Sequence, residues 1–131
     1  LAGGDVPVGG NGAFYPPTVI AGLGNDSVVA QEEIFGPVVT VIPFDDERDA
    51  IRIANEVKYG LMATVWTGDP ARGHRVAARI KSGTVGVNMP YTAFPGIPFG
   101  GFKQSGFGRE LGMHALDGYS EVKNVFYSTE G

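Results

Sequence analysis

Short apolar runs alternate with helical patterns between residues 38 and 88, and this alternation constrains the fold more than any other feature. The runs at 38–42, 62–67 and 84–88 are rich in β-branched residues, which is typical of buried strands. The two segments between them repeat apolar residues at helical spacing. Strands and helices that alternate through short links favour parallel strands with right-handed crossovers. The sequence therefore predicts an α/β fold, with a parallel-type sheet and flanking helices.

The ends of the two helical segments carry recognisable signals. Asp45 or Asp46 can cap the first helix, and Asp69 followed by Pro70 can begin the second. A glycine follows each segment, where a helix commonly ends. A single helical turn is also expected at Val28–Glu33, ended by the Gly-Pro pair that follows it.

The two ends of the chain are less regular. Residues 1–18 should form an entry segment, with a turn at 9–12. Residues 89–108 are rich in Pro, Gly and Phe and lack periodicity, which indicates a long functional loop. We expect a helix at 109–116 and a final strand at 120–127, whose free edge could pair with another chain.

Composition narrows the classes of protein and of site. The 131 residues carry a net charge of −4 and no basic run, so nucleic acids and anionic membranes are not expected partners. No apolar run approaches the roughly 20 residues that cross a bilayer. The chain should bury roughly two-thirds of its unfolded surface. We expect a cytoplasmic protein, with the beginning of the chain, and any targeting signal, upstream of Leu1.

The sequence has no cysteine, which excludes disulfides, thiolate metal sites and a cysteine nucleophile within these residues. His74 and His114 have no second histidine at helical spacing, so we expect no metal site. The glycines at 106–112 imitate a dinucleotide fingerprint, but their spacing is one residue too long and no strand precedes them.

For two groups of residues, both a purely structural and a functional interpretation stay open. Glu32 and Glu33 are either solvated carboxylates or, beside Phe35, a carboxylate that accepts hydrogen bonds from two ribose hydroxyls. Four phenylalanines of the long loop belong either to the core or to a pocket: Phe94, Phe99, Phe102 and Phe107.

Several segments, taken in order, match one known pattern. They are Gln31–Pro37 (QEEIFGP), Tyr59–Leu61, Ser82–Asn88, Pro98–Gly112 (PFGGFKQSGFGRELG) and Tyr119–Lys123. Together they resemble the signatures of the aldehyde dehydrogenase superfamily over almost the whole chain. The resemblance is to the C-terminal part of the catalytic domain of an NAD(P)-dependent enzyme.

The resemblance implies roles for individual residues. Glu33 matches the carboxylate that holds the nicotinamide ribose, and Phe35 the aromatic residue beside it. Phe99 matches an aromatic wall of the aldehyde funnel, and Phe94 lies in the variable specificity loop. Glu110 matches a carboxylate linked to proton relay.

The resemblance also places the main chemistry elsewhere. The nucleophilic cysteine and the general base belong upstream, so this chain alone should be inactive. The intact enzyme would oxidise a small-molecule aldehyde to a carboxylic acid with NAD or NADP, through a thioester on that cysteine. Residues 1–118 would be the C-terminal portion of the catalytic domain. Residues 119–131 would be an oligomerisation strand and tail, giving a homodimer or homotetramer. The alternative is a non-catalytic β/α binding or assembly module derived from the same fold. The particular aldehyde, and the choice between NAD and NADP, stay open.

Overall fold

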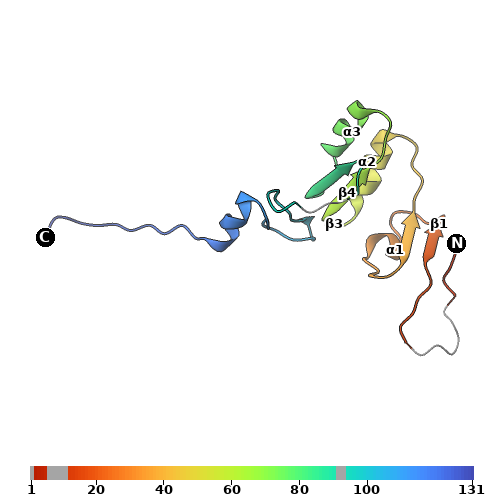
Figure 1. Ribbon diagram of the computed structural model, residues 1–131, viewed down its shortest axis with the longest axis horizontal. Coiled ribbons are helices and arrows are strands. Elements are labelled where there is room, and N and C mark those ends of the chain that lie inside the picture. The colour runs from red at the N-terminus through yellow and green to blue at the C-terminus, as the bar shows by residue number, and fades with distance from the viewer. Residues whose placement is uncertain (1, 6–11, 91–93) are drawn as a thin grey trace. The chain divides into compact units, whose positions relative to one another are not determined.

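The computed structural model describes residues 2–5, 12–90 and 94–131, and it divides into two compact units, residues 1–58 and 59–131 (Figure 1). The turn expected at 9–12 lies, apart from Gly12, outside the described residues. Within the described part, no helix is long and apolar enough to cross a membrane. Each unit is taken by itself below.

The first unit is built on a pair of parallel strands. Its elements are β1 (Thr18–Ala21), α1 (Val28–Gln31), β2 (Val38–Val41) and α2 (Glu47–Glu56). Strands β1 and β2 run side by side, with Thr18 opposite Val38 and Ala21 opposite Val41 (Figure 1). The strand expected at 38–42 and the helical turn after Val28 are therefore confirmed.

Helix α2 begins as its capping residues predict. The side chain of Asp46 accepts a hydrogen bond from the backbone N–H of Asp49 at 2.8 Å, which satisfies one of the free donors at the helix start. Arg52 binds Asp49 and Glu56 on either side along one face of the helix. The helix ends at Glu56, before the glycine that was expected to end it.

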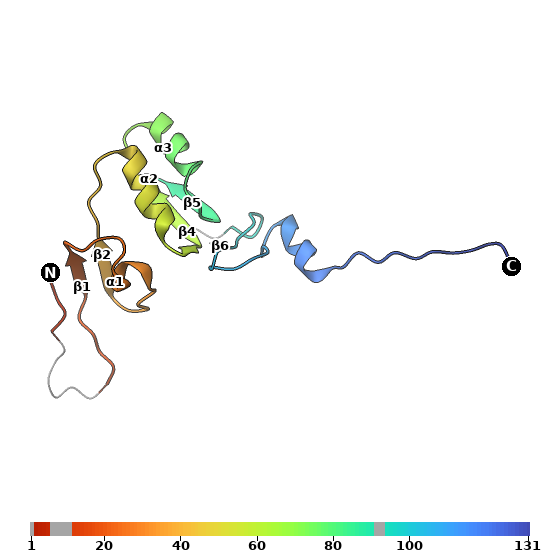
Figure 2. The same cartoon turned by 180° about the vertical axis from the view of Figure 1, so that it is seen from behind.

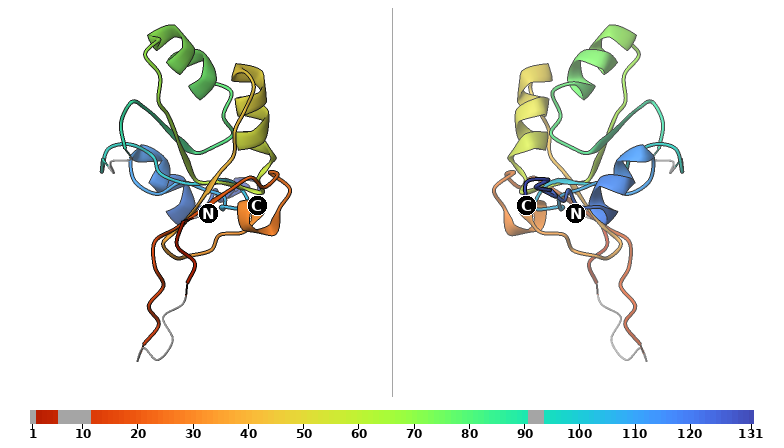
Figure 3. Two further views of the ribbon diagram at one scale, coloured as in Figure 1. Left: turned by 90° about the vertical axis from the view of Figure 1, so that its right-hand side faces the viewer. Right: turned by 90° about the vertical axis from the view of Figure 1, so that its left-hand side faces the viewer.

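The second unit contains a strand–helix–strand crossover. Its elements are β3 (Tyr59–Gly60), β4 (Met62–Val65), α3 (Pro70–Ala77), β5 (Thr84–Val87), β6 (Phe102–Lys103) and the 3₁₀ helix η1 (Met113–Tyr119). Strands β4 and β5 are parallel, and α3 lies along one side of them (Figures 2 and 3). Asp69 caps α3 and Pro70 is its first residue, so this part of the prediction is confirmed.

The expected sheet of three sequential strands is wrong. Among the described residues, β2 pairs with β1 and β4 with β5, each as a two-stranded sheet. Strand β1 was not foreseen: it begins at Thr18, the last residue of the expected entry segment. It begins directly after Pro16–Pro17, which have no N–H to donate, with Thr18 donating to the carbonyl of Pro37 at 2.8 Å. The short antiparallel pair of β3 and β6 was also not foreseen.

The helix expected at 109–116 is wrong in its position. Gly108, Leu111 and Gly112 have φ values of 78°, 59° and 56°, which lie outside the right-handed helical region. Glu110 instead forms an isolated antiparallel bridge with Phe99. Helical structure begins only at Met113, as the 3₁₀ helix η1.

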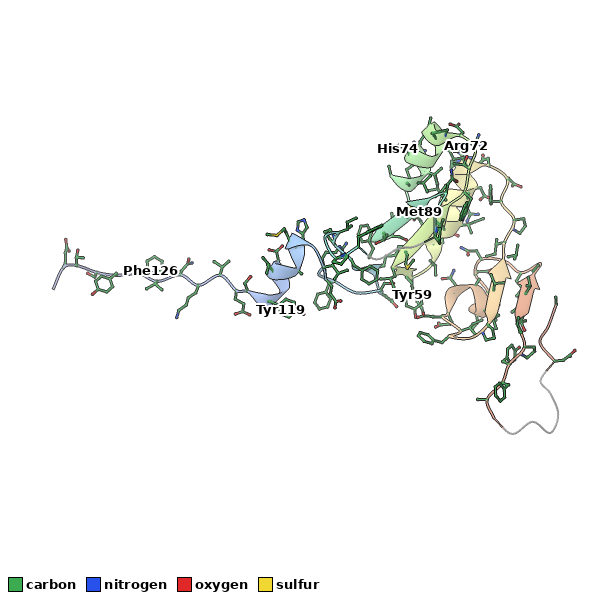
Figure 4. The ribbon with its side chains drawn as sticks, viewed as in Figure 1. Tyr59, Arg72, His74, Met89, Tyr119 and Phe126 are labelled. Carbon is green, nitrogen blue, oxygen red and sulfur yellow. The ribbon has the colours of Figure 1, made fainter. Side chains whose placement is uncertain are left out.

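Residues 120–131 form neither helix nor strand, so the strand expected at 120–127 is not present in the chain by itself (Figure 4). Apolar side chains along it are exposed, with Val122 at 98% and Phe126 at 94%. A strand needs a hydrogen-bonded neighbour, and no other described segment pairs with these residues.

The prediction that the chain buries a sizeable apolar core is wrong for the chain by itself. Among the described residues, Val76 is the one apolar side chain that is buried. The helices and strands form, but most of their apolar faces are left uncovered.

Candidate functional site

The loop between α1 and β2 borders a hollow of about 580 Å³ in the first unit. Glu33 and Phe35 both line it. The neighbouring Glu32 lies 2.6 Å from the ammonium of Lys58, which compensates its charge. Glu33 forms neither a hydrogen bond nor an ion pair with the described part of the chain, so both its carboxylate oxygens can accept hydrogen bonds from a ligand.

Phe35 is held in an uncommon conformation. Its φ is 54°, in the left-handed region that a bulky side chain rarely adopts, and its ring is 92% exposed. Such backbone strain often accompanies functional sites. The main chain then turns sharply, since Val38 donates to the carbonyl of Gly36 at 2.7 Å. Phe35 lies before this turn and lines the same hollow as Glu33.

A second, more apolar cavity of about 230 Å³ lies in the second unit. Phe94 and Phe99 both line it, together with Met62, Met89 and Leu111. The two phenylalanines proposed from the sequence as pocket residues are therefore brought together.

The other two phenylalanines of the long loop do not line this apolar cavity. The ring of Phe102 lies 5.3 Å from the guanidinium carbon of Arg109, a cation–π distance. The side chain of Phe107 is fully exposed. Of the four, only Phe94 and Phe99 fit the interpretation as walls of this cavity.

Glu110 is tied to Phe99 through the backbone. Each residue donates its N–H to the other's carbonyl at 2.7 Å. Both residues also line a third hollow of about 530 Å³, formed largely by the glycine-rich segment 100–108. Phe99 therefore separates the apolar cavity from a hollow that contains the exposed carboxylate of Glu110.

Comparison with known proteins assigns the chain to a family. The model of the aldehyde dehydrogenase family matches residues 1–125. The chain belongs to the aldehyde dehydrogenase family. It is 48% identical over 120 residues to the betaine aldehyde dehydrogenase of Bacillus subtilis, covering 92% of this chain and 24% of that protein. It is 51% identical over 129 residues to a 2-aminomuconic 6-semialdehyde dehydrogenase of a Pseudomonas species, covering 95% of this chain and 26% of that protein.

Solved structures of aldehyde dehydrogenases share its fold. A Mycobacterium tuberculosis aldehyde dehydrogenase complexed with NAD+ matches all of this chain and 27% of its own, with a TM-score of 0.87 at 45% identity. An NAD+ complex from Bacillus cereus matches 98% of this chain and 26% of its own, with a TM-score of 0.87 at 47% identity. The predicted family and the α/β fold class are confirmed. The chain spans about a quarter of the length of the relatives it matches.

Sequence reasoning missed the side chains that hold the dehydrogenase loops in place. The hydroxyl of Ser105 accepts a hydrogen bond from Gly60 N–H at 2.9 Å, and the amide of Asn88 binds both backbone groups of Thr67 at 2.8 Å. Ser105 and Asn88 both lie in segments that carry the resemblance, but neither was given a role. For Asn88 there was a further signal, since asparagine adopts positive φ more often than most residues, and its φ is 54°.

One lysine of this loop region, Lys103, has a lowered pKa. Burial lowers the pKa of Lys103, and the nearby charge of Lys81 lowers it further. The Lys103 ammonium lies 3.3 Å from the carbonyl of Tyr59, across the β3–β6 pair. The two histidines considered as metal ligands lie on separate elements, His74 on α3 and His114 on η1, where it faces Asp117 at 3.7 Å.

Proposed function

We propose that this chain supplies a nicotinamide-ribose clamp and part of the aldehyde pocket of an NAD(P)-dependent aldehyde dehydrogenase. The observation that carries the proposal is the uncommitted carboxylate of Glu33 beside the exposed ring of Phe35 in one hollow. The NAD+ complexes of relatives at 45% and 47% identity support it.

The chemistry of the hollow fits the cofactor. A carboxylate with two free oxygens accepts hydrogen bonds from two adjacent ribose hydroxyls, and such charge-assisted bonds are strong. An exposed phenylalanine ring offers an apolar face to a planar heteroaromatic ring. When bound there, the nicotinamide would supply the acceptor for a hydride from the substrate. Glu33 and Phe35 would orient that end of the cofactor, whereas the phosphate-binding residues lie outside this chain.

The apolar cavity suits the carbon chain of an aldehyde. Phe94 and Phe99 would exclude water from the substrate, and Glu110 would relay a proton on the other side of Phe99. A cysteine thiolate outside this chain would add to the carbonyl carbon, and loss of hydride would leave a thioester. A base-activated water would then release the carboxylic acid and the thiol.

The test compares two adjacent carboxylates in the intact enzyme. Glu33→Gln weakens the charge-assisted hydrogen bonds to the ribose, so kcat/KM for NAD should fall by about 10- to 150-fold, the equivalent of ~1.5–3 kcal/mol. Glu32→Gln is the matched control, because it removes only an exposed ion pair with Lys58 and should change kcat/KM by less than about threefold. The measurement is NADH formation from a panel of aldehydes.

Equal effects of the two substitutions would refute the clamp. A well-folded intact protein that forms no NADH from any aldehyde, and no NADPH from NADP, would instead favour the non-catalytic assembly module.

We also propose that residues 120–127 become an edge strand paired with another subunit, in a homodimer or homotetramer. In an extended chain Val122 and Phe126 would share one face, and Val125 and Tyr127 the other. All four are exposed in the chain by itself, so apolar surface is available on both faces. Such a strand would hydrogen-bond to a neighbouring sheet.

A proline substitution tests this pairing in the intact enzyme. Val125→Pro removes a backbone donor and should shift the enzyme toward the monomer in sedimentation. Val125→Ala retains the donor and is the control. An unchanged sedimentation profile for the proline variant would contradict strand-mediated assembly.

A further inference from the structure

We infer that Asn88 is a positioning residue for the aldehyde pocket, acting through the wall formed by Met89, Pro90 and Phe94. The inference rests on the proposed function of the apolar cavity and deepens it, because it names a residue that would determine which aldehydes the cavity accepts. Asn88 itself does not line that cavity.

The side-chain amide of Asn88 forms the hydrogen bonds that the next backbone pair of the β4–β5 sheet would otherwise form. Strands β4 and β5 pair in parallel up to Val65 opposite Val87, and the backbone N–H of Asn88 donates to the carbonyl of Val65 at 2.9 Å. The side-chain amide then pairs with Thr67: Oδ1 accepts from its N–H at 2.8 Å and Nδ2 donates to its carbonyl at 2.8 Å. A primary amide has the donor and acceptor that a backbone peptide group has, so it can replace the next pair of the ladder.

The partner of this clamp is itself fixed. The hydroxyl of Thr67 accepts from the N–H of Asp69 at 3.1 Å, and Asp69 caps α3 through Ala71 and Arg72. The amide of Asn88 therefore connects the end of β5 to the beginning of α3.

The main chain meanwhile turns back at Asn88, where φ is 54°. A Cβ added at Gly86 would lie 2.8 Å from the carbonyl oxygen of Met89, which shows that the chain folds back over β5 directly after Asn88. Met89, labelled in Figure 4, then lines the apolar cavity together with Pro90 and Phe94. The clamp and the reversal together fix where this wall of the cavity stands.

The residue type matters for two separate reasons. Asparagine tolerates positive φ better than most residues, and its amide has both a donor and an acceptor at the required length. Asn88→Gly keeps the backbone freedom and removes the amide. Asn88→Asp keeps the size but places a carboxylate oxygen against the carbonyl of Thr67, where a donor is required.

The experiment measures selectivity in the intact enzyme with hexanal and acetaldehyde as probes. A misplaced wall loses contacts with the longer chain, so the ratio of kcat/KM for hexanal over acetaldehyde should fall about tenfold in Asn88→Gly. Asn88→Asp should lower the same ratio, and Gly86→Ala should lower it by displacing Met89 from the other side. The KM for NAD should stay within about twofold, because Asn88 does not line the hollow of Glu33 and Phe35.

The control is Asp46→Ala, which removes the cap of the other helix, α2, and leaves the hydrogen bonds of Asn88 and Thr67 intact. It should leave the ratio of the two aldehydes within about twofold while lowering stability. An unchanged ratio in Asn88→Gly, or an equal fall in Asp46→Ala, would overturn the inference and leave Asn88 with a structural role only.

A second measurement does not depend on activity. Hydrogen exchange of the amides at 94–99 should become about tenfold faster in Asn88→Gly, with α3 unchanged. Unaltered exchange at 94–99 would overturn the inference even if the enzyme oxidises neither aldehyde. Faster exchange without activity on any aldehyde would retain Asn88 as the residue that fixes this cavity wall and would refute the proposed function instead.

Discussion

Substitution of Gly83 tests which contacts fix the position of the glycine-rich loop, residues 100–108, in the second unit. Its N–H donates to the carbonyl of Gly60 at 3.0 Å. A Cβ at Gly83 would overlap the carbonyl of Gly100 and lie 3.5 Å from Cα of Gly101. The obstructing atoms belong to the main chain, so no side-chain rotation can relieve the overlap. Gly83→Ala must therefore move the segment that carries Phe99 and Glu110.

The magnitude follows from this geometry. Extra methyl groups in packed regions cost about 1–3 kcal/mol. A cost of about 2 kcal/mol corresponds to roughly 30-fold more frequent local opening. We therefore expect hydrogen exchange of the amides at 98–110 in the intact enzyme to become about 30-fold faster in Gly83→Ala, measured by mass spectrometry.

Gly68→Ala is the matched control. A Cβ at Gly68 would meet no atom within 4 Å, and its φ is not in the left-handed region. It should change exchange by less than about threefold, and it could slightly stabilise the fold by restricting the unfolded chain. Equal exchange rates in the two variants would refute the claim that close backbone contact at Gly83 holds the loop.

Two further predictions concern activity and acid stability. The isolated 131-residue chain should form no NADH from any aldehyde, because it has no cysteine, and should bind NAD weakly in calorimetry; NADH formation or micromolar affinity would contradict this. Helix α2 should lose stabilisation in acid, because hydrogen bonds from Arg52 hold the pKa values of Asp49 and Glu56 below their ordinary 3.8 and 4.5. Because these carboxyl pKa values are lowered by folding, the two groups stabilise the folded state when the pH is above their ordinary pKa values. This stabilisation is lost as the pH falls through the pKa values that the groups have in the folded state. Arg52→Met should therefore lower the urea midpoint at neutral pH more than at about pH 3, with Arg48→Met as control; equal losses at both pH values would count against it.

Local signals in the sequence were sufficient for most individual elements. The caps Asp46 and Asp69 and the apolar runs of β2, β4 and β5 act over a few residues, so their positions could be predicted. Pairing was harder, because it depends on contacts between distant residues. The pair of β1 with β2 required recognising a strand immediately after two prolines.

The residues that line the candidate site could be predicted from the sequence, whereas the residue that holds one of its walls in place could not. Glu33 with Phe35, and Phe94 with Phe99, lie together as the motifs implied. The residue that fixes the second pair's cavity was not found. Asn88 acts through hydrogen bonds to Thr67, 21 positions away, and no short motif records such a contact.

The failure of the predicted core has the same origin. Hydrophobic periodicity indicates which face of an element is to be covered, but not what covers it. Phe44 and Trp66 are 61% and 68% exposed although they lie beside well-formed strands. Exposed apolar side chains on this scale are unusual for a monomer. In the proposed dehydrogenase, the remaining three-quarters of a polypeptide as long as its relatives would supply the missing cover. A charged residue in place of Trp66 would disrupt that cover and should therefore reduce assembly of the intact enzyme. Helix α3 should be affected less, because it already has its own cap and a buried Val76.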